Sequence, residues 1–99
     1  MKDLKEIKKI LIKHKKFLKE KYDIINIKVF GSYTKNKVTE KSDIDLIVKF
    51  RKVKSLMEIV RIEREISQML NIKVDLLTEK GISPFIIEDI LKEAKYIFK

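Results

Sequence analysis

Three stretches of the chain carry apolar residues at three- and four-residue spacing, which is the period of an amphipathic helix. The first begins at Asp3, in a capping-box-like sequence, and is expected to end near Tyr22. The second spans residues 55–70 and opens on a capping box, S-L-M-E. The third begins at Ser83 and Pro84, a hydroxyl cap followed by a proline at the first helical position, and is expected to run almost to the last residue.

Three other stretches alternate apolar and polar residues or form short apolar runs, as strands do. In residues 24–30, IINIKVF, apolar positions such as Ile27 are expected to face one way and Lys28 the other. Residues 43–50, DIDLIVKF, begin with two aspartates before an apolar run. Residues 71–77, NIKVDLL, place a third aspartate off the apolar row. The pattern therefore predicts three strands, and the second and third of them carry aspartates.

The order helix, strand, short turn, strand, helix, strand, helix predicts an α+β fold. We expect a small mixed β-sheet with helices packed on one face, which leaves the other face to the carboxylates. A chain of 99 residues can build one modest core but no separate substrate domain, so residues 1–99 are expected to form a single domain. A large or specific substrate would then require a partner.

The charge of the chain bounds the class of partner. The sequence has 24 lysine and arginine residues against 15 aspartate and glutamate residues, a net charge of +9. Such a surface attracts nucleotide triphosphates, nucleic acids or acidic protein faces. Few of the cations are arginine, which base-specific readout favours, and no aromatic pattern of the RNP type is present. Nucleic acid is therefore not expected as the partner.

Other features of the composition exclude several kinds of site. The chain has no cysteine, which excludes disulfides and thiolate metal sites, and its one histidine, His14, lies on the apolar stripe of the first helix. A partly buried structural histidine is expected there. No apolar run is long enough to span a membrane, and the N-terminus lacks the features of a signal peptide. We expect no membrane association and a cytoplasmic location.

The two aspartates at the start of the second strand, Asp43 and Asp45, favour a divalent cation. Side chains two residues apart point to the same face of a strand, about 6.6 Å apart along it. Magnesium binds one or two carboxylates together with waters and phosphate oxygens, so an acidic pair without histidine or cysteine indicates a hard cation. Zinc is disfavoured.

Gly31 and Ser32 directly follow the first strand, where the chain has to turn sharply. Glycine lets a phosphate approach the backbone closely, and the serine hydroxyl adds a hydrogen-bond donor. A phosphate cradle after one strand and a carboxylate pair at the start of the next are the groups that nucleotidyl transfer needs. If the third strand lies beside the second, Asp75 completes a triad, as a metal ligand or as the base for the incoming hydroxyl.

The sequence G-S-x10-D-x-D, with a strand aspartate some thirty residues later, resembles the signature of the DNA polymerase beta-like nucleotidyltransferase superfamily. The chain length is similar to that of its minimal nucleotidyltransferases (MNT), which are often antitoxin partners of a HEPN-domain toxin. The resemblance implies the nucleotidyltransferase fold, with Gly31 and Ser32 on the triphosphate of ATP. It also implies that Asp43, Asp45 and Asp75 are the catalytic carboxylates and hold Mg²⁺, as two ions.

One stretch departs from the family pattern. Family members commonly continue as GSRARG, whereas this chain reads GSYTKNK, with Tyr33 and Asn36 at the positions of an arginine and the second glycine. Asn36 can adopt a left-handed turn, and Lys35 or Lys37 can supply the positive charge. Nucleotide affinity or base choice is expected to differ as a result.

The resemblance implies a transfer of AMP from ATP to a hydroxyl, in the MNT subgroup a tyrosine of the cognate HEPN toxin. Two alternatives remain open from the sequence. One is the same chemistry on a small hydroxylated molecule, although larger relatives that do this carry an additional helical domain. The other is an antitoxin that acts by binding alone, without catalysis.

Overall fold

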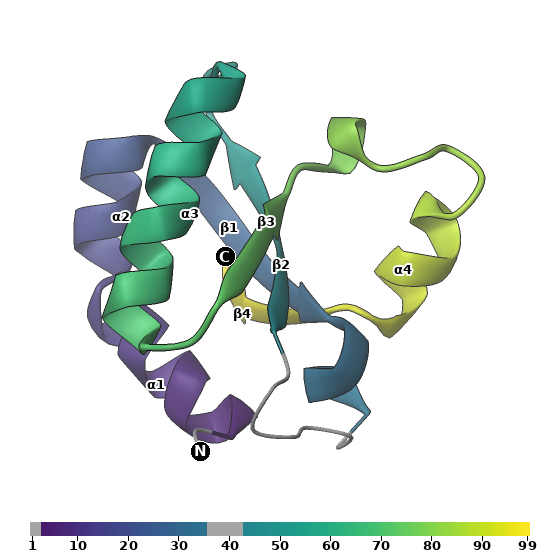
Figure 1. Cartoon of the computed structure of the whole chain (residues 1–99), viewed down its shortest axis with the longest axis horizontal. Helices are drawn as coiled ribbons and strands as arrows, with labels where there is room; N and C mark the ends of the chain where they lie inside the picture. The colour runs from purple at the N-terminus through teal and green to yellow at the C-terminus, as the bar shows by residue number, and fades with distance from the viewer. Residues whose placement is uncertain (1–2, 36–42) are drawn as a thin grey trace.

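The computed structural model describes residues 3–35 and 43–99, and a four-stranded sheet lies at its centre (Figure 1). The strand order is β3-β2-β1-β4. β1 pairs antiparallel with both β2 and β4, whereas β2 and β3 are parallel, so the predicted mixed sheet is confirmed. The strands are β1 (Ile24–Phe30), β2 (Ile44–Phe50), β3 (Val74–Leu77) and β4 (Lys95–Phe98).

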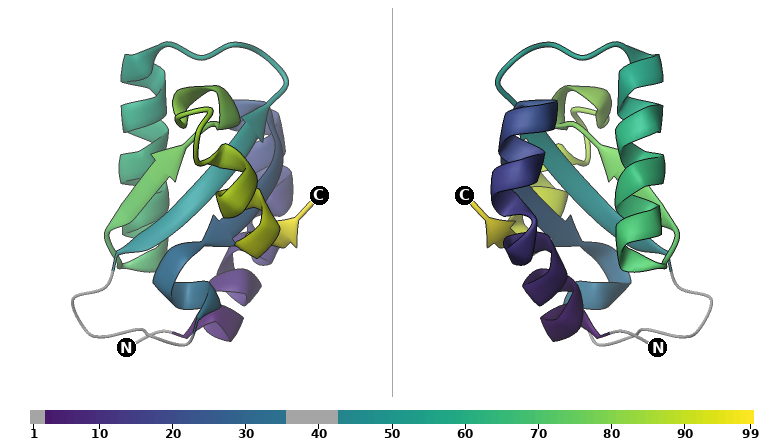
Figure 2. Two further views of the ribbon diagram at one scale, coloured as in Figure 1. Left: turned by 90° about the vertical axis from the view of Figure 1, so that its right-hand side faces the viewer. Right: turned by 90° about the vertical axis from the view of Figure 1, so that its left-hand side faces the viewer.

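Three helices pack on one face of this sheet, and a short fourth helix lies on the other side (Figures 1 and 2). The layer on the first face is formed by α1 (Leu4–Lys13), α2 (Lys15–Tyr22) and α3 (Leu56–Leu70). The fourth helix, α4 (Ile87–Glu93), contacts β1 and the 3-10 helix η1 (Gly31–Thr34), and a second 3-10 helix, η2, spans Glu79–Gly81. The predicted α+β class is confirmed. Among the described residues, no helix combines the length and apolarity of a membrane span.

The hydrophobic core lies between the sheet and these three helices. Apolar side chains on alternate strand positions face the helices, as the period of two requires. The buried residues form one continuous cluster, which includes Ile27, Val29, Ile44, Leu46, Val48, Val74 and Leu76 from the sheet and Ile7, Leu11, Leu18, Ile62, Ile66 and Leu70 from the helices. The positions between them, on the opposite face of the sheet, carry Lys28, Asp45 and Asp75.

Two of the three predicted helix starts are confirmed. The third is wrong, because α4 begins at Ile87, after the N-cap residue Ile86, and not at Ser83 and Pro84. Asp3 accepts a hydrogen bond from the backbone N–H of Glu6 at 2.9 Å. Ser55 and Glu58 form a complete capping box, in which each side chain accepts from the backbone N–H of the other residue, at 3.2 and 3.3 Å. These bonds satisfy N–H groups that have no partner inside the helix, which fixes where α1 and α3 begin.

The first predicted helix is divided in two at His14. The backbone of His14 leaves the helical region, with φ −99° and ψ 10°, and its ring nitrogen Nδ1 donates a hydrogen bond to the Ile10 carbonyl at 2.8 Å. The side chain is half-buried. The structural role expected for this histidine agrees with the geometry, although the break in the helix was not predicted.

The prediction of a helix that runs almost to the last residue is wrong. α4 ends at Glu93, Ala94 is extended, and the last residues form β4, in which Phe98 pairs with Ile27 and Tyr96 with Lys28. The apolar residues do have helical spacing, but the helix that they form covers only Ile87–Glu93. The open edge of β1 offers backbone hydrogen bonds and burial of Ile97 and Phe98, and these tertiary gains outweigh the local preference.

We expect Ile97→Ala to lower the free energy of unfolding by about 2–5 kcal/mol, because it leaves a cavity beside the core. Tyr96→Ala is the matched control, since Tyr96 is 42% exposed whereas Ile97 is 3% exposed. Urea unfolding of the two variants measures the difference. Equal and small costs for both would contradict the placement of β4 against the core.

Candidate active site

Asp45 and Asp75 lie side by side on the face of the sheet away from α1, α2 and α3. The parallel pairing of β2 with β3 puts these two residues in the same register position. The residue before each aspartate, Ile44 in β2 and Val74 in β3, is buried in the core. Because the apolar neighbours are fixed in the core, both aspartates have to face the opposite way. The predicted adjacency of the two strands is confirmed.

The two carboxylates disturb each other electrostatically. Burial raises the pKa of Asp45, and the negative charges of Asp75 and Asp43 raise it further, as does a side-chain hydrogen bond with Asp75. A hydrogen bond between two carboxyl groups requires that one of them carries a proton. Without a cation, this pair is therefore unfavourable when both members are ionised, and a divalent ion would reverse the effect.

Asp43 lies one residue before β2 and has a cation beside it. Its Oδ2 forms a salt bridge with Lys73 Nζ at 3.7 Å. The backbone of the two strand starts is also tied, since Ile44 N–H donates to the Lys73 carbonyl at 3.0 Å. Asp43 is nevertheless close enough for its charge to raise the pKa of Asp45. Lys73 could not be identified from the sequence, because only the pairing of the two strand starts brings it to Asp43.

The three aspartates do not form a finished metal site. Among residues 3–35 and 43–99, no three His, Cys, Asp or Glu side chains converge as a group that could hold an ion. Asp45 and Asp75 are in hydrogen-bond contact, whereas Asp43 pairs with Lys73. The donor set consists of carboxylate oxygens only, which suits a hard cation such as magnesium.

Gly31 lies directly against Asp45, and a side chain at its position would be strained. Its φ is +78°, a left-handed conformation that side chains disfavour. A Cβ atom added there would be only 2.5 Å from Asp45 Oδ2. The turn is closed by Thr34, whose hydroxyl donates to the Gly31 carbonyl at 2.7 Å. The expected sharp turn at Gly31 and Ser32 is thus a 3-10 helix that presents its backbone to the carboxylate.

The stretch that departs from the family pattern forms part of the wall of this site. Tyr33 is buried, and its pKa is raised by burial and then by the charge of Asp43. Lys35 pairs with Glu93 of α4 at 3.2 Å, which ties η1 to that helix. Asn36 and Lys37, with the expected loop up to residue 42, lie outside the described residues.

Lys28 shares the face of the carboxylates, as strand alternation predicted. It lies opposite Ile47 in the sheet, one row along from Asp45, and its side chain is only 17% exposed. Its Nζ lies 3.6 Å from Glu79 Oε1 and 4.8 Å from the centre of the Tyr96 ring. The sequence placed Lys28 on the correct face, but its partners come from segments about fifty and seventy residues away along the chain.

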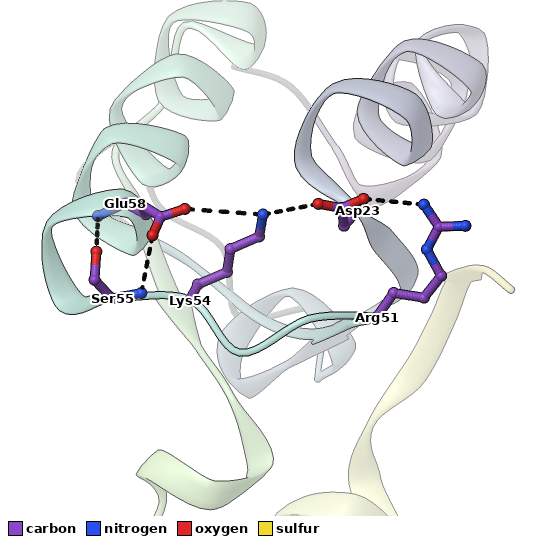
Figure 3. A network of polar contacts seen from close by, with 5 residues as sticks. All are labelled: Asp23, Arg51, Lys54, Ser55 and Glu58. Atoms are coloured by element: carbon purple, nitrogen blue, oxygen red, sulfur yellow. Dashed lines mark hydrogen bonds and ion pairs between the residues drawn. The ribbon is translucent and has the colours of Figure 1, made fainter.

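The basic connector after β2 is not part of this site. Arg51 and Lys54 both bind Asp23, at 2.9 and 3.0 Å (Figure 3). These bonds, that from Lys54 first, lower the pKa of Asp23 to about 2. Because they lie at the opposite end of β2 from Asp45, the two cations stabilise the sheet end instead of facing the carboxylates.

The chain matches a known family over most of its length. A family model for the nucleotidyltransferase domain matches residues 11–97, which include the Gly31 turn and both carboxylate strands. A relative from Methanocaldococcus jannaschii, assigned as a protein adenylyltransferase, is 46% identical over 98% of this chain and 100% of its own. The protein adenylyltransferase MntA of Thermococcus cleftensis is 35% identical over 95% of each chain.

Solved structures share the fold. A toxin-antitoxin crystal structure with AMP-PNP has a TM-score of 0.76 at 21% identity, over 92% of this chain and 72% of that chain. A structure assigned as a minimal nucleotidyltransferase has a TM-score of 0.72 at 26% identity, over 90% and 93%. A complex of tri-AMPylated Shewanella oneidensis HEPN toxin with MNT antitoxin gives 0.69 at 19% identity, over 93% and 71%.

We expect Asp75→Asn to leave the cation-free protein no less stable at neutral pH, because it removes a charge that repels Asp45. The folded state holds the Asp45 proton more tightly than the unfolded chain does. Stability of the wild type therefore falls as pH rises from the ordinary value of 3.8 through the raised pKa of Asp45. The fall should be smaller in the variant. Urea unfolding in the presence of EDTA, over a series of pH values, measures it.

Asp23→Asn is the control of opposite sign. The pKa of Asp23 is lowered, so its contribution to stability is present above 3.8 and is lost as pH falls towards about 2. If stability rises with pH through the whole acid range in both the wild type and the Asp23→Asn variant, that result contradicts the repulsion between Asp45 and Asp75.

We expect Gly31→Ala to lower the free energy of unfolding by at least about 1 kcal/mol, because the new side chain is strained at positive φ and meets Asp45. Gly81→Ala is the matched control, since a Cβ there meets only the movable Thr78 hydroxyl at 3.2 Å. Ser32→Ala should weaken ATP binding less than Gly31→Ala does. Equal, negligible effects of the Gly31 and Ser32 changes on ATP affinity, measured by calorimetry, would make this turn purely structural.

Proposed function

Because this chain belongs to the nucleotidyltransferase family, among the protein adenylyltransferases, we propose that it transfers AMP from ATP to a tyrosine hydroxyl of a HEPN-domain toxin. It would thereby act as the antitoxin of a toxin-antitoxin pair. The observation that carries the proposal is the register of β2 and β3, which holds Asp45 beside Asp75 with Gly31 against them.

The proposed roles follow from this arrangement. Gly31 and Ser32 hold the triphosphate, because the glycine backbone has no side chain to keep a phosphate away. Asp43, Asp45 and Asp75 are the catalytic carboxylates, and they would hold two Mg²⁺ ions. The salt bridge of Asp43 with Lys73 is mostly exposed, at 37% and 75% of the two side chains, so giving it up costs little.

The reaction forms a bond between the acceptor oxygen and the α-phosphorus of ATP and breaks the bond from that phosphorus to the pyrophosphate. Magnesium, when bound, supplies positive charge to the triphosphate and to the pentavalent transition state. The protein holds the triphosphate in line with the acceptor, and Asp75 accepts the proton of the hydroxyl. Lys28, on the same face, adds a positive charge near the row of carboxylates.

The proposed acceptor rests on the relatives. The relative from Thermococcus is a protein adenylyltransferase, and an MNT antitoxin of this fold is found with an AMPylated HEPN toxin. A protein acceptor supplies its own surface. ATP as the donor agrees with a reaction in the cytoplasm.

We expect the double change Asp43→Asn and Asp45→Asn to reduce AMP transfer at least about a hundredfold, because it removes the charge of two ligands and keeps their shape. Transfer of label from α-labelled ATP to the purified HEPN toxin measures it. Glu20→Gln, which removes a carboxylate from an exposed position on α2, is the control and should leave transfer unchanged.

Asp75→Asn distinguishes the enzyme from an antitoxin that only binds. Under the proposal it neither transfers AMP nor neutralises the toxin in cells, although it binds the toxin as tightly as the wild type. If it still neutralises without transfer, neutralisation is by binding. If the wild type labels a small hydroxylated molecule but not the toxin, the proposed acceptor is wrong.

A further inference from the structure

A cavity lies at the end of β2 that is remote from the carboxylates. β3 ends at Leu77, opposite Ile47, whereas β2 continues to Phe50. The part of β2 beyond β3 lies between α3 and η2, and these segments line a cavity of about 540 Å³ that is open to solvent on one side. Apolar side chains of Val48, Phe50 and Ile59 form part of its lining.

An exposed apolar patch adjoins this cavity. Val53 lines the cavity and is 95% exposed, and Leu56, Met57 and Val60 on α3 are 76%, 76% and 44% exposed. Leu56 and Val60 are four residues apart and so lie on one side of the helix. Glu63, one turn further along, accepts a hydrogen bond from the Leu76 N–H, so this side of α3 lies next to β3. Ile59, the neighbour of Val60, lines the cavity. We call the cavity and these four residues the α3 corner.

The rim of the α3 corner carries lysine side chains that form no salt bridge within the described part of the chain. Arg51 and Lys54 pair with Asp23, and Lys54 also pairs with Glu58 (Figure 3). Glu79, an acidic residue in the lining, pairs with Lys28. In the described part of the chain, no acidic side chain pairs with the three remaining lysines of the lining, Lys49, Lys52 and Lys80.

We infer that the α3 corner is a docking surface for an acidic segment of a partner protein, which inserts an apolar side chain into the cavity and lays further apolar side chains on Leu56, Met57 and Val60. Its carboxylates meet Lys49, Lys52 and Lys80. The partner is identified through the proposed function, as the HEPN-domain toxin that receives AMP. An apolar centre within a charged rim is the usual construction of a protein interface.

Three other occupants fit the corner less well. A small anion in the cavity would leave the patch on α3 uncovered. A nucleic acid would find aliphatic side chains there in place of the aromatic ones that stack with bases. A second copy of this chain would bring two lysine rims together, since each chain carries a net charge of +9.

The position of the corner separates docking from chemistry. Asp45 stands near one end of β2 and Arg51 just beyond the other, a distance of about 20 Å at roughly 3.3 Å per residue. A partner protein can span this distance. Loss of the docking surface should therefore weaken binding and raise the KM for the toxin while kcat at saturation stays the same.

Two variants test the corner. Leu56→Asp combined with Met57→Asp removes the apolar patch at exposed positions of the first helical turn, where acidic residues are tolerated. Lys52→Glu combined with Lys80→Glu reverses the rim. We expect each to weaken the Kd for the purified cognate HEPN toxin at least tenfold and to raise its KM in AMP transfer to the same extent, with kcat unchanged.

Controls match the two changes elsewhere on the surface. Phe85→Asp alters an apolar side chain that is 94% exposed outside the corner, and Lys8→Glu with Lys9→Glu reverses two exposed lysines of α1. Both should leave Kd within about twofold of the wild type. An unchanged Kd in the corner variants overturns the inference. An equal loss in the lysine controls also overturns it, because the attraction is then a general effect of charge.

Sedimentation of the chain alone tests for a second copy. If the corner variants convert a dimer to a monomer and bind the toxin normally, the corner is a self-association surface and the inference fails. A wild type that binds the toxin but transfers no AMP would defeat the proposed function alone, since the Kd values still decide whether the corner is the docking surface.

Discussion

The parallel pairing of β2 with β3 is the constraint on which the rest of the site depends. It sets two carboxylates side by side, which is unfavourable in the absence of a cation, because burial and like charge both raise the pKa of Asp45. α3 holds β3 in place against this repulsion. Ser67 and Glu63 accept hydrogen bonds from the outer N–H groups of Val74 and Leu76, at 2.9 and 2.8 Å. Burial of Val74 and Leu76 in the core supplies the remaining stabilisation.

The same bonds close one edge of the sheet. Because α3 already occupies the outer N–H groups of Val74 and Leu76, a partner strand has no donors to pair with there. At β3 a partner therefore has to bind through side chains, which agrees with an interface at the exposed apolar residues of α3. The short length of β3 leaves the last residues of β2 without a strand neighbour on that side, and the cavity follows from this difference in length.

The two ends of β2 are thus used differently. At one end, carboxylates gather, since Asp43 and Asp45 meet Asp75. In residues 3–35 and 43–99, Lys73 is the one cation in a salt bridge with this group, and its partner is Asp43. At the other end, Asp23 is surrounded by Arg51 and Lys54, which hold its pKa at about 2 and tie the connector to the start of β1. The first end is where we propose that a cation and a triphosphate bind. At the second end, the carboxylate already has cations beside it.

The sequence by itself determined the three core strands, the starts of α1 and α3, and the site residues Gly31, Ser32, Asp43, Asp45 and Asp75 as candidates. These follow from short-range rules: alternation decides which face a strand residue takes, and capping residues decide where a helix begins. Tertiary structure alone decided the rest. Residues 95–98 form a strand because β1 has a free edge. Asp43 meets Lys73 because two strands start together. Arg51 and Lys54 form ion pairs with Asp23, which lies about thirty residues earlier in the chain. Such pairings depend on which distant segments become neighbours, and local sequence periodicity carries no information about that.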